Sequence, residues 1–151
     1  MSMIGKTMLL ITLAAVLLAA CTSQPTLTPI LLSPQSNNPY APQPGDGTKI
    51  QSNADIASAA IMLAESFPPQ VSLSLAYRLP TPCYQLRVSI SHPDDQNRIQ
   101  LDVYGVAPKD QACTLMALAT PLQASISLGS FPGGHYTIWV NGVQVGNFTI
   151  Q

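Results

Sequence analysis

The sequence predicts an all-β protein, an antiparallel sandwich of seven to eight short strands that follows an N-terminal tether. Apolar and polar residues alternate with a period of two in several runs after residue 70, as in strands with one buried and one solvated face. Turn-forming residues separate these runs at intervals of about 8–12 residues, which is typical of a sandwich. Charged residues make up only 9% of the 151 residues, so we expect outer faces that are polar but neutral.

The composition also limits the function classes. The net charge is −1 and no cluster of Lys or Arg is present, so nucleic acid is not an expected partner. No segment matches a nucleotide-binding, serine-hydrolase or zinc-protease motif. We therefore expect no cofactor, no metal, no catalytic residue and no enzyme activity.

The first 20 residues are typical of a cleaved bacterial signal peptide. After Lys6, the apolar run 8–18 is too short to cross a bilayer of about 30 Å, which takes roughly 20 helical residues. The run ends in Leu18-Ala19-Ala20-Cys21, which resembles a lipobox. In lipoproteins with this pattern the cysteine receives a diacylglyceryl group and becomes the new N-terminus. We therefore expect Cys21 to carry lipid, such as palmitate, and to anchor the chain outside the cytoplasm on the cell membrane or outer membrane. The alternative is an ordinary signal peptide.

Residues 21–53 are interpreted as a tether, and residues 54–151 as the sandwich domain. Six of the fourteen prolines fall between Pro25 and Pro44, and each removes a backbone donor and restricts φ. The alternative is a partly ordered tail in which Leu31, Leu32 and Tyr40 dock on the domain.

The segment 55–65 is compatible with two structures. Its alanines and the spacing of Ile56 and Ala59 favour a helix capped at Asn53 or Ser52. The apolar run before Ser66-Phe67-Pro68-Pro69 is also typical of a strand that ends at a proline turn. Because the remainder of the domain has strand periodicity, we favour the strand.

Six further strands follow from the alternation of apolar residues. They run from Val71 to Tyr77, Tyr84 to Ile90, Ile99 to Val103, Leu122 to Leu128, Tyr136 to Val140 and Val143 to Ile150. Turn formers at 92–97 and 129–134 separate some of them. Asn141-Gly142 is the strongest signal for a two-residue hairpin turn.

The cysteines predict one disulfide. If Cys21 is lipidated, Cys83 and Cys113 can pair in an oxidising compartment. Cys83 precedes the hairpin predicted over 84–103, and Cys113 follows its return strand, so both lie at the open end. The alternative, two free thiols or metal ligands, is less favoured because there is no CxxC motif.

Two resemblances refine the fold. The spacing of Leu128, Gly134 and Tyr136 resembles the tyrosine corner of immunoglobulin-like domains, which implies a hydrogen bond from the Tyr136 hydroxyl to upstream backbone. The segments Leu79-Pro-Thr-Pro-Cys83 and Gly134-His-Tyr-Thr-Ile-Trp-Val-Asn-Gly142, with Cys113 between them, resemble a group of bacterial lipoproteins of unknown function over residues 56–151. That resemblance implies an immunoglobulin-like sandwich with a strand before residue 66, and no activity.

Three side chains are candidate binding residues. Trp139 is predicted on the outer face of a sheet, and His92 and His135 lie beside turns. The most favoured function is a noncatalytic binding or structural domain displayed on the envelope, with a possible envelope protein partner. The alternatives are a protease inhibitor that presents loop 92–97 or 129–134, an accessory subunit of an extracytoplasmic complex, and an enzyme with a scattered site.

Overall fold

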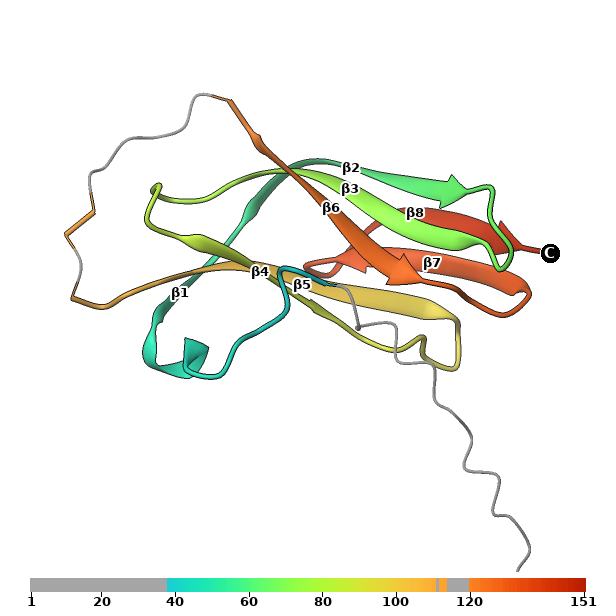
Figure 1. Cartoon of the computed structure of the whole chain (residues 1–151), viewed down its shortest axis with the longest axis horizontal. Coiled ribbons are helices and arrows are strands. Elements are labelled where there is room, and N and C mark those ends of the chain that lie inside the picture. The colour runs from blue at the N-terminus through green and yellow to red at the C-terminus, as the bar shows by residue number, and fades with distance from the viewer. Residues whose placement is uncertain (1–37, 111, 114–119) are drawn as a thin grey trace, which may run out of the picture. The chain divides into compact units, whose positions relative to one another are not determined.

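The computed structural model describes residues 38–110, 112–113 and 120–151, and in this part of the chain the fold is a sandwich of two β-sheets (Figure 1). The predicted all-β class is confirmed, and the described part has eight strands, seven of which the sequence located. The signal peptide, Cys21, Leu31 and Leu32 lie outside the described residues. In the described part, no helix has the length and apolar character needed to cross a membrane.

One sheet has three strands and the other has five. The smaller sheet has the order β2-β3-β6, and the larger has the order β1-β5-β7-β8 with β4 on the other side of β5. The elements are η1 (Asp46–Thr48), β1 (Ile50–Asn53), β2 (Asp55–Ala64), β3 (Gln70–Arg78), β4 (Gln85–Ile90), β5 (Arg98–Ala107), β6 (Leu122–Gly129), β7 (Gly134–Val140) and β8 (Val143–Ile150). The segment for which helix and strand competed is thus the strand β2, which pairs with β3 along its length.

The sequence predicts a purely antiparallel sandwich, and this detail is wrong. Strand β7 pairs with β5 in parallel, from Arg98 opposite Thr137 to Leu101 opposite Val140. Because β5 has ten residues, one of its edges has room for two partners, and β7 occupies only the first part of this edge. Local alternation predicts strands and does not specify which distant strands pair.

The boundary predicted between tether and domain is also wrong. Residues 50–53 form β1, which pairs antiparallel with the second part of the same β5 edge, from Ile50 opposite Ala107 to Asn53 opposite Tyr104. Tyr40 packs against the hydrophobic core, as the alternative of a docked tail had it. The error arises because a short edge strand with exposed residues has no apolar alternation to reveal it.

Asn141 closes the gap between β7 and β1 on β5. Its side-chain oxygen accepts a hydrogen bond from the Val103 amide at 2.7 Å, and its side-chain nitrogen donates to the Val103 carbonyl at 3.0 Å. Asn141 has a φ of 49°, in the left-handed region that the predicted Asn-Gly hairpin turn requires. One residue therefore makes the turn and also satisfies the edge of the neighbouring strand.

The core lies between the two sheets and is built from the inward side of each alternation. Its fully buried side chains are Leu73, Leu75, Ile99, Leu101, Ile126, Leu128, Ile138, Val71, Val88, Val103 and Val106. Phe131, Tyr136 and Phe148 form an aromatic cluster with ring centroids 5.1–5.4 Å apart. The Tyr136 hydroxyl donates to the Pro132 carbonyl at 3.2 Å, so the hydrogen bond implied by the tyrosine-corner spacing is present.

Cys83 and Cys113 form a disulfide with a Cα–Cα distance of 5.9 Å. The bridge ties the residue that precedes Tyr84 and β4 to the connection between β5 and β6. The predicted pairing therefore agrees with the structure, and it links two segments 30 residues apart.

Candidate functional site

A polar groove of about 830 Å³ lies on the outer face of the five-stranded sheet, where β4, β5 and β1 lie side by side (Figure 1). Its position follows from the alternation of β5, because the exposed Asp102 and half-buried Tyr104 flank the buried Val103. Ser89 on β4 lies directly opposite Asp102, and Asn53 on β1 lies opposite Tyr104. The lining is completed by Pro42, Gln51, Ser52, Val103 and Asn141.

Most polar side chains of this groove have no hydrogen-bonding partner among the described residues of the protein. Within residues 38–110, 112–113 and 120–151, the side chains of six lining residues make no hydrogen bond or ion pair. These are Gln51, Ser52, Asn53, Ser89, Asp102 and Tyr104. Polar groups clustered in this way are solvated, and a ligand that enters must replace the hydrogen bonds with water.

One wall of the groove is fixed by a buried ion pair. Arg87 points outward from β4, yet it is only 4% exposed because the segment 38–49 covers it. The Arg87 Nε donates to the Asp46 Oδ2 at 2.7 Å. The hydrogen bond from Arg87, helped by one from the Gln43 amide, lowers the pKa of Asp46 well below its ordinary value of 3.8.

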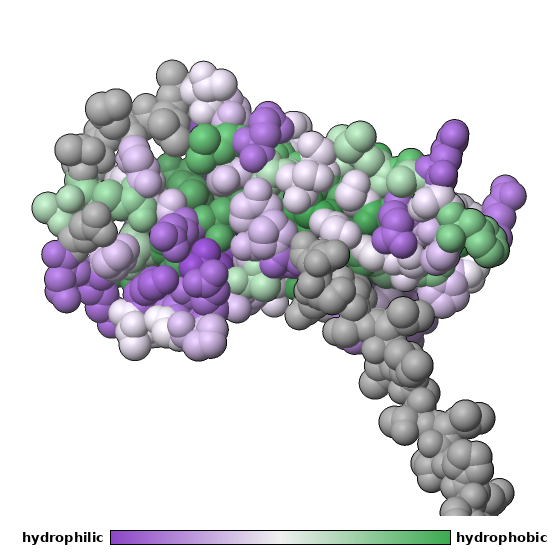
Figure 2. Space-filling model, viewed as in Figure 1, coloured by the Kyte–Doolittle hydropathy of each residue, from purple (hydrophilic) through white to green (hydrophobic). Residues whose placement is uncertain are grey.

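The same segment is also held by backbone groups of β4. The Val88 amide donates to the Tyr40 carbonyl at 2.7 Å, and the Asn38 side chain donates to the Val88 carbonyl at 2.8 Å. Pro42 lies between Tyr40 and Asp46 in the chain, so both contacts position it at the groove. Figure 2 shows hydrophilic residues gathered over the η1 end of the domain.

Trp139 lies on the same outer face and outside the groove lining. It stands opposite Gln100 on β5 and is half-buried. Its indole Nε1 donates to the Thr137 Oγ1 at 3.2 Å, so the ring leans along β7 away from Asn141 and the groove. Its predicted place on the outer face thus agrees with the structure, but the structure does not bring it to the cluster of polar groups.

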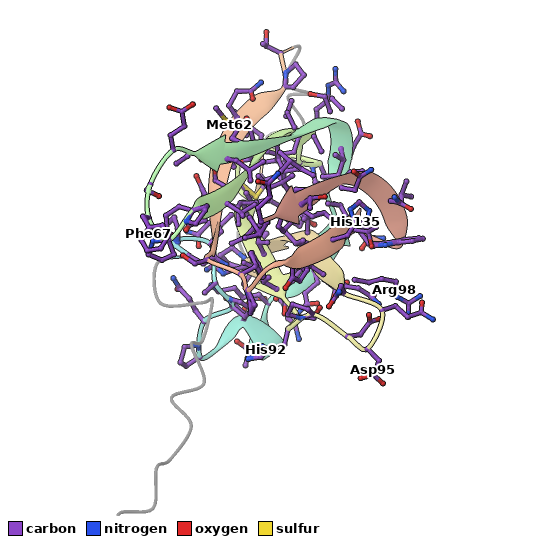
Figure 3. All side chains as sticks on the ribbon, turned by 90° about the vertical axis from the view of Figure 1, so that its right-hand side faces the viewer. Met62, Phe67, His92, Asp95, Arg98 and His135 are labelled. Carbon is purple, nitrogen blue, oxygen red and sulfur yellow. A yellow bond between two sulfur atoms is a disulfide. The ribbon has the colours of Figure 1, made fainter. Side chains whose placement is uncertain are left out.

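The two histidines do not converge on a site. His135 Nδ1 lies 3.0 Å from the Thr149 hydroxyl on the adjacent strand β8, and His92 is exposed in the connection from β4 to β5. Figure 3 shows them far from each other on the molecule. Across the described ranges, no three His, Cys, Asp or Glu side chains form a group that could hold a metal ion.

Asp94 stabilises its own turn. Its carboxylate accepts hydrogen bonds from the Gln96 and Arg98 amides, both at 2.9 Å, and from the Arg98 Nε at 2.7 Å. The bond from the Arg98 amide is the main cause of its lowered pKa. The loop 92–97 is therefore a rigid turn, with Asp95 and Arg98 visible at its end in Figure 3.

A second, apolar groove of about 420 Å³ lies beside β2 and the turn between β7 and β8. It is lined by Ala54, Asp55, Ile56, Ser58, Ala59, Val140, Asn141, Val143 and Val145. Near the far end of β2, Met62 and Leu63 are exposed, and Phe67 in the following turn is fully exposed. Figure 3 shows Met62 and Phe67 away from His135 and Arg98.

Sequence reasoning missed the groove because its parts come from distant segments. The alternation of β5 could have placed Asp102 and Tyr104 on one outward row. No local signal shows that Gln51 and Asn53 lie beside that row, since this depends on the pairing of β1 with β5.

Comparisons with known proteins identify the family and leave the function open. Residues 73–150 match the model of the ORF11 beta-sandwich domain, a range that includes Ser89, Asp102, Tyr104 and Asn141. The chain is 36% identical over 92 residues to an uncharacterized 10.2 kDa protein in the HgiCIIM 5′ region of Herpetosiphon aurantiacus, covering 58% of this chain and 92% of the relative. No solved structure matches. With more than half of its length matched by the family model, this chain belongs to the ORF11 beta-sandwich domain family.

Proposed function

We propose that this chain is a lipid-anchored envelope protein that displays a noncatalytic binding domain, with the polar groove as the binding site. The observation that supports binding is the groove itself, in which five polar side chains on the outer face, those of Gln51, Asn53, Ser89, Asp102 and Tyr104, surround one open surface and have no partner among the described residues. The noncatalytic character is supported by the contents of the groove, because Asp102 is the one acidic or basic residue that lines it. Ser89 and Tyr104 carry hydroxyls on the same face, but no His, Lys or second carboxylate lines the groove to act with them as an acid or base.

The anchor is supported by the sequence Leu18-Ala19-Ala20-Cys21 at the end of a short apolar run. Acyl chains contribute about 0.8 kcal/mol per buried methylene, so two or three of them hold a protein firmly on a membrane. Labelling with radioactive palmitate tests this directly. The chain should incorporate label and sediment with membranes, and Cys21→Ser should do neither. Labelled, membrane-bound Cys21→Ser protein would refute the anchor.

The binding role is tested by capture from an envelope extract of the source cell. The full chain in detergent is immobilised, and bound material is compared for the parent, Tyr104→Ala and Trp139→Ala. We expect the parent and Trp139→Ala to retain the same material and Tyr104→Ala to lose it. Loss with Trp139→Ala alone would move the site to β7, as the sequence had suggested. Equal retention by all three variants would contradict both sites.

The immunoglobulin-like character of the sandwich belongs to the same proposal. It is supported by the hydrogen bond from Tyr136 to Pro132, which matches the role of the tyrosine corner in those domains. The parallel pairing of β5 with β7 differs from the all-antiparallel pairing that the sequence predicted.

A second candidate function is an accessory subunit or protease inhibitor, which the exposed apolar tip favours. Phe67 is 101% exposed and is followed by two prolines, and Met62 and Leu63 lie close by on β2. Exposed apolar clusters of this kind are common at protein interfaces. Inhibition of any enzyme in a protease panel, abolished by Phe67→Ala, would support this function. The absence of inhibition at micromolar concentrations would rule out the function of protease inhibitor.

A further inference from the structure

The hydrogen-bonding groups of the groove suit a ligand rich in hydroxyl or amide groups. Gln51 and Asn53 each offer a donor and an acceptor, and the hydroxyls of Ser89 and Tyr104 can act as either. Asp102 adds a carboxylate that only accepts. Any ligand that displaces water here must present donors and acceptors together, because a polar group left unpaired on binding would lose its hydrogen bonds to water without replacement.

The charges of the groove disfavour an anionic ligand. Asp102 is its one charged residue, and no Lys, Arg or His lines it. The nearest guanidinium on β4, that of Arg87, is buried and already bonded to Asp46. A phosphate, sulfate or uronate would therefore meet a carboxylate and no compensating cation.

The backbone around the groove disfavours an extended peptide. Peptides commonly bind by adding a strand to a free sheet edge, where backbone groups are unpaired. Here β5 is paired with β4 on one side and with β7 and β1 on the other. The Val103 groups between β7 and β1 are taken by the Asn141 side chain and the Ala54 amide. Recognition over β5 must therefore depend on side chains, and the outer edge of β1 is a strand edge beside the groove that has no strand partner in the described residues.

Tyr104 supplies the apolar surface that such a ligand needs. Its side chain is half-buried on the same row as Asp102 and lines the groove, so an aromatic ring lies beside the acceptors and donors. Sugar rings combine an apolar C–H face with a rim of hydroxyls, and aromatic rings carry a negative face that attracts those C–H groups.

We infer that the groove binds a neutral oligosaccharide, with Tyr104 stacked on a sugar ring and Asp102, Asn53 and Gln51 bonded to its hydroxyl or N-acetyl groups. This inference deepens the proposed function and depends on it, since both use the same groove. The groove crosses three strands on an open sheet face, a form that accommodates a chain of sugars.

The test separates the ligand class from the existence of a ligand. The full chain in detergent is titrated with the saccharide fraction of protease-treated envelopes from the source cell, before and after periodate oxidation. Periodate cleaves bonds between carbons with adjacent hydroxyls and leaves peptide bonds intact. We expect binding to survive the protease treatment and to fall at least about tenfold after periodate.

Variants tie the binding to the groove. Asp102→Asn keeps the size of an exposed side chain and should weaken binding by about tenfold or more, since a hydrogen bond to a charged group is worth roughly 1.5–3 kcal/mol. Tyr104→Ala should abolish binding, and Tyr104→Phe should retain most of it. Ser125→Ala, exposed on the other sheet, is the matched control and should bind like the parent.

Each other outcome overturns the inference. Two outcomes would indicate a protein ligand: binding that survives periodate, or material captured from whole extract that is lost on protease treatment. In either case the proposed binding function would be retained and the inference of a saccharide ligand would be wrong. No binding to the saccharide fraction together with no capture from whole extract would remove both.

Discussion

The outer faces of the two sheets differ, although both follow the same alternation in sequence. On the three-stranded sheet most outward residues are small: Ala60, Ser74 and Ser125 are aligned across the strands, and Ser72 and Ser127 are aligned beside Met62. On the five-stranded sheet the outward residues include Arg87, Asp102, Tyr104 and Trp139. A chain segment, 38–49, lies over part of that face.

The difference shows how a sheet face becomes a site. Large polar side chains leave room between one another, and a covering segment adds a wall, whereas aligned serines and alanines leave a flat surface. The contacts that build the groove are long-range: Arg87 meets a carboxylate 41 residues away, and Val103 meets an amide 38 residues away. The following substitutions compare the effect of removing these contacts with the effect of changes on the outer face of the three-stranded sheet, which we call the plain face.

The largest effect is expected from Arg87→Ala. It leaves the buried carboxylate of Asp46, which belongs to the covering segment, without its main partner, and breaking a buried pair by removing one partner is strongly destabilising. We expect the melting temperature of the full chain in detergent to fall by more than about 10 °C. Arg78→Ala, which breaks the exposed pair with Asp55, is the control and should change it by less than about 3 °C. Equal decreases in melting temperature for the two variants would contradict the role of the Arg87–Asp46 pair in holding the covering segment 38–49.

Cys83→Ala should follow closely. Opening a loop of 30 residues should lower the free energy of unfolding by about 3–4 kcal/mol in the chain-entropy model. Denaturant titration of parent and variant under oxidising conditions measures the loss. Under reducing conditions the two proteins should become equal; identical stabilities when oxidised would mean that the cysteines are not paired.

Asn141→Ala removes the joint between β7 and β1. It loses two hydrogen bonds to Val103 and places alanine at a positive φ, so we expect a loss of about 2–3 kcal/mol. Asn141→Gly also loses both hydrogen bonds but adopts the positive φ without strain, so it should lose less. A Gly variant less stable than the Ala variant would contradict the account of this joint.

The acid side of the stability profile should depend on Asp46. Its pKa is lowered on folding, so the stabilisation is fully present above the ordinary value of 3.8 and is lost as the pH falls below it. Asp46→Asn should therefore be less stable than the parent at pH 7, and the difference should shrink below about pH 4. A constant difference from pH 7 to pH 2.5 would mean that Asp46 makes no pH-dependent contribution.

The smallest effect is expected on the plain face. Ser125→Thr adds a methyl group to an exposed strand position with neighbours Ser74 and Ala60, so it should change stability by less than about 0.5 kcal/mol. A larger loss would show that the three-stranded face is covered by something in the full chain.

The sequence predicts this fold well wherever the information is local. The alternation located β3, β4, β6, β7 and β8, and Asn141-Gly142 located a hairpin turn. The sequence does not predict β1 or the parallel pairing of β7, because both depend on which part of the long β5 edge each strand occupies. The sequence does not predict the groove for the same reason. It singles out Trp139, a rare residue, as a candidate binding residue and does not single out Tyr104.

The measurement that tests the central claim most directly is a map of backbone amide NMR shifts for the full chain in detergent, with and without the envelope saccharide fraction. We predict shifts at Asn53, Ser89, Asp102 and Tyr104, with Ser74 and Ser125 unchanged. Shifts confined to β3 and β6, or to the region of Met62 and Phe67, would contradict the groove as the binding site of this protein.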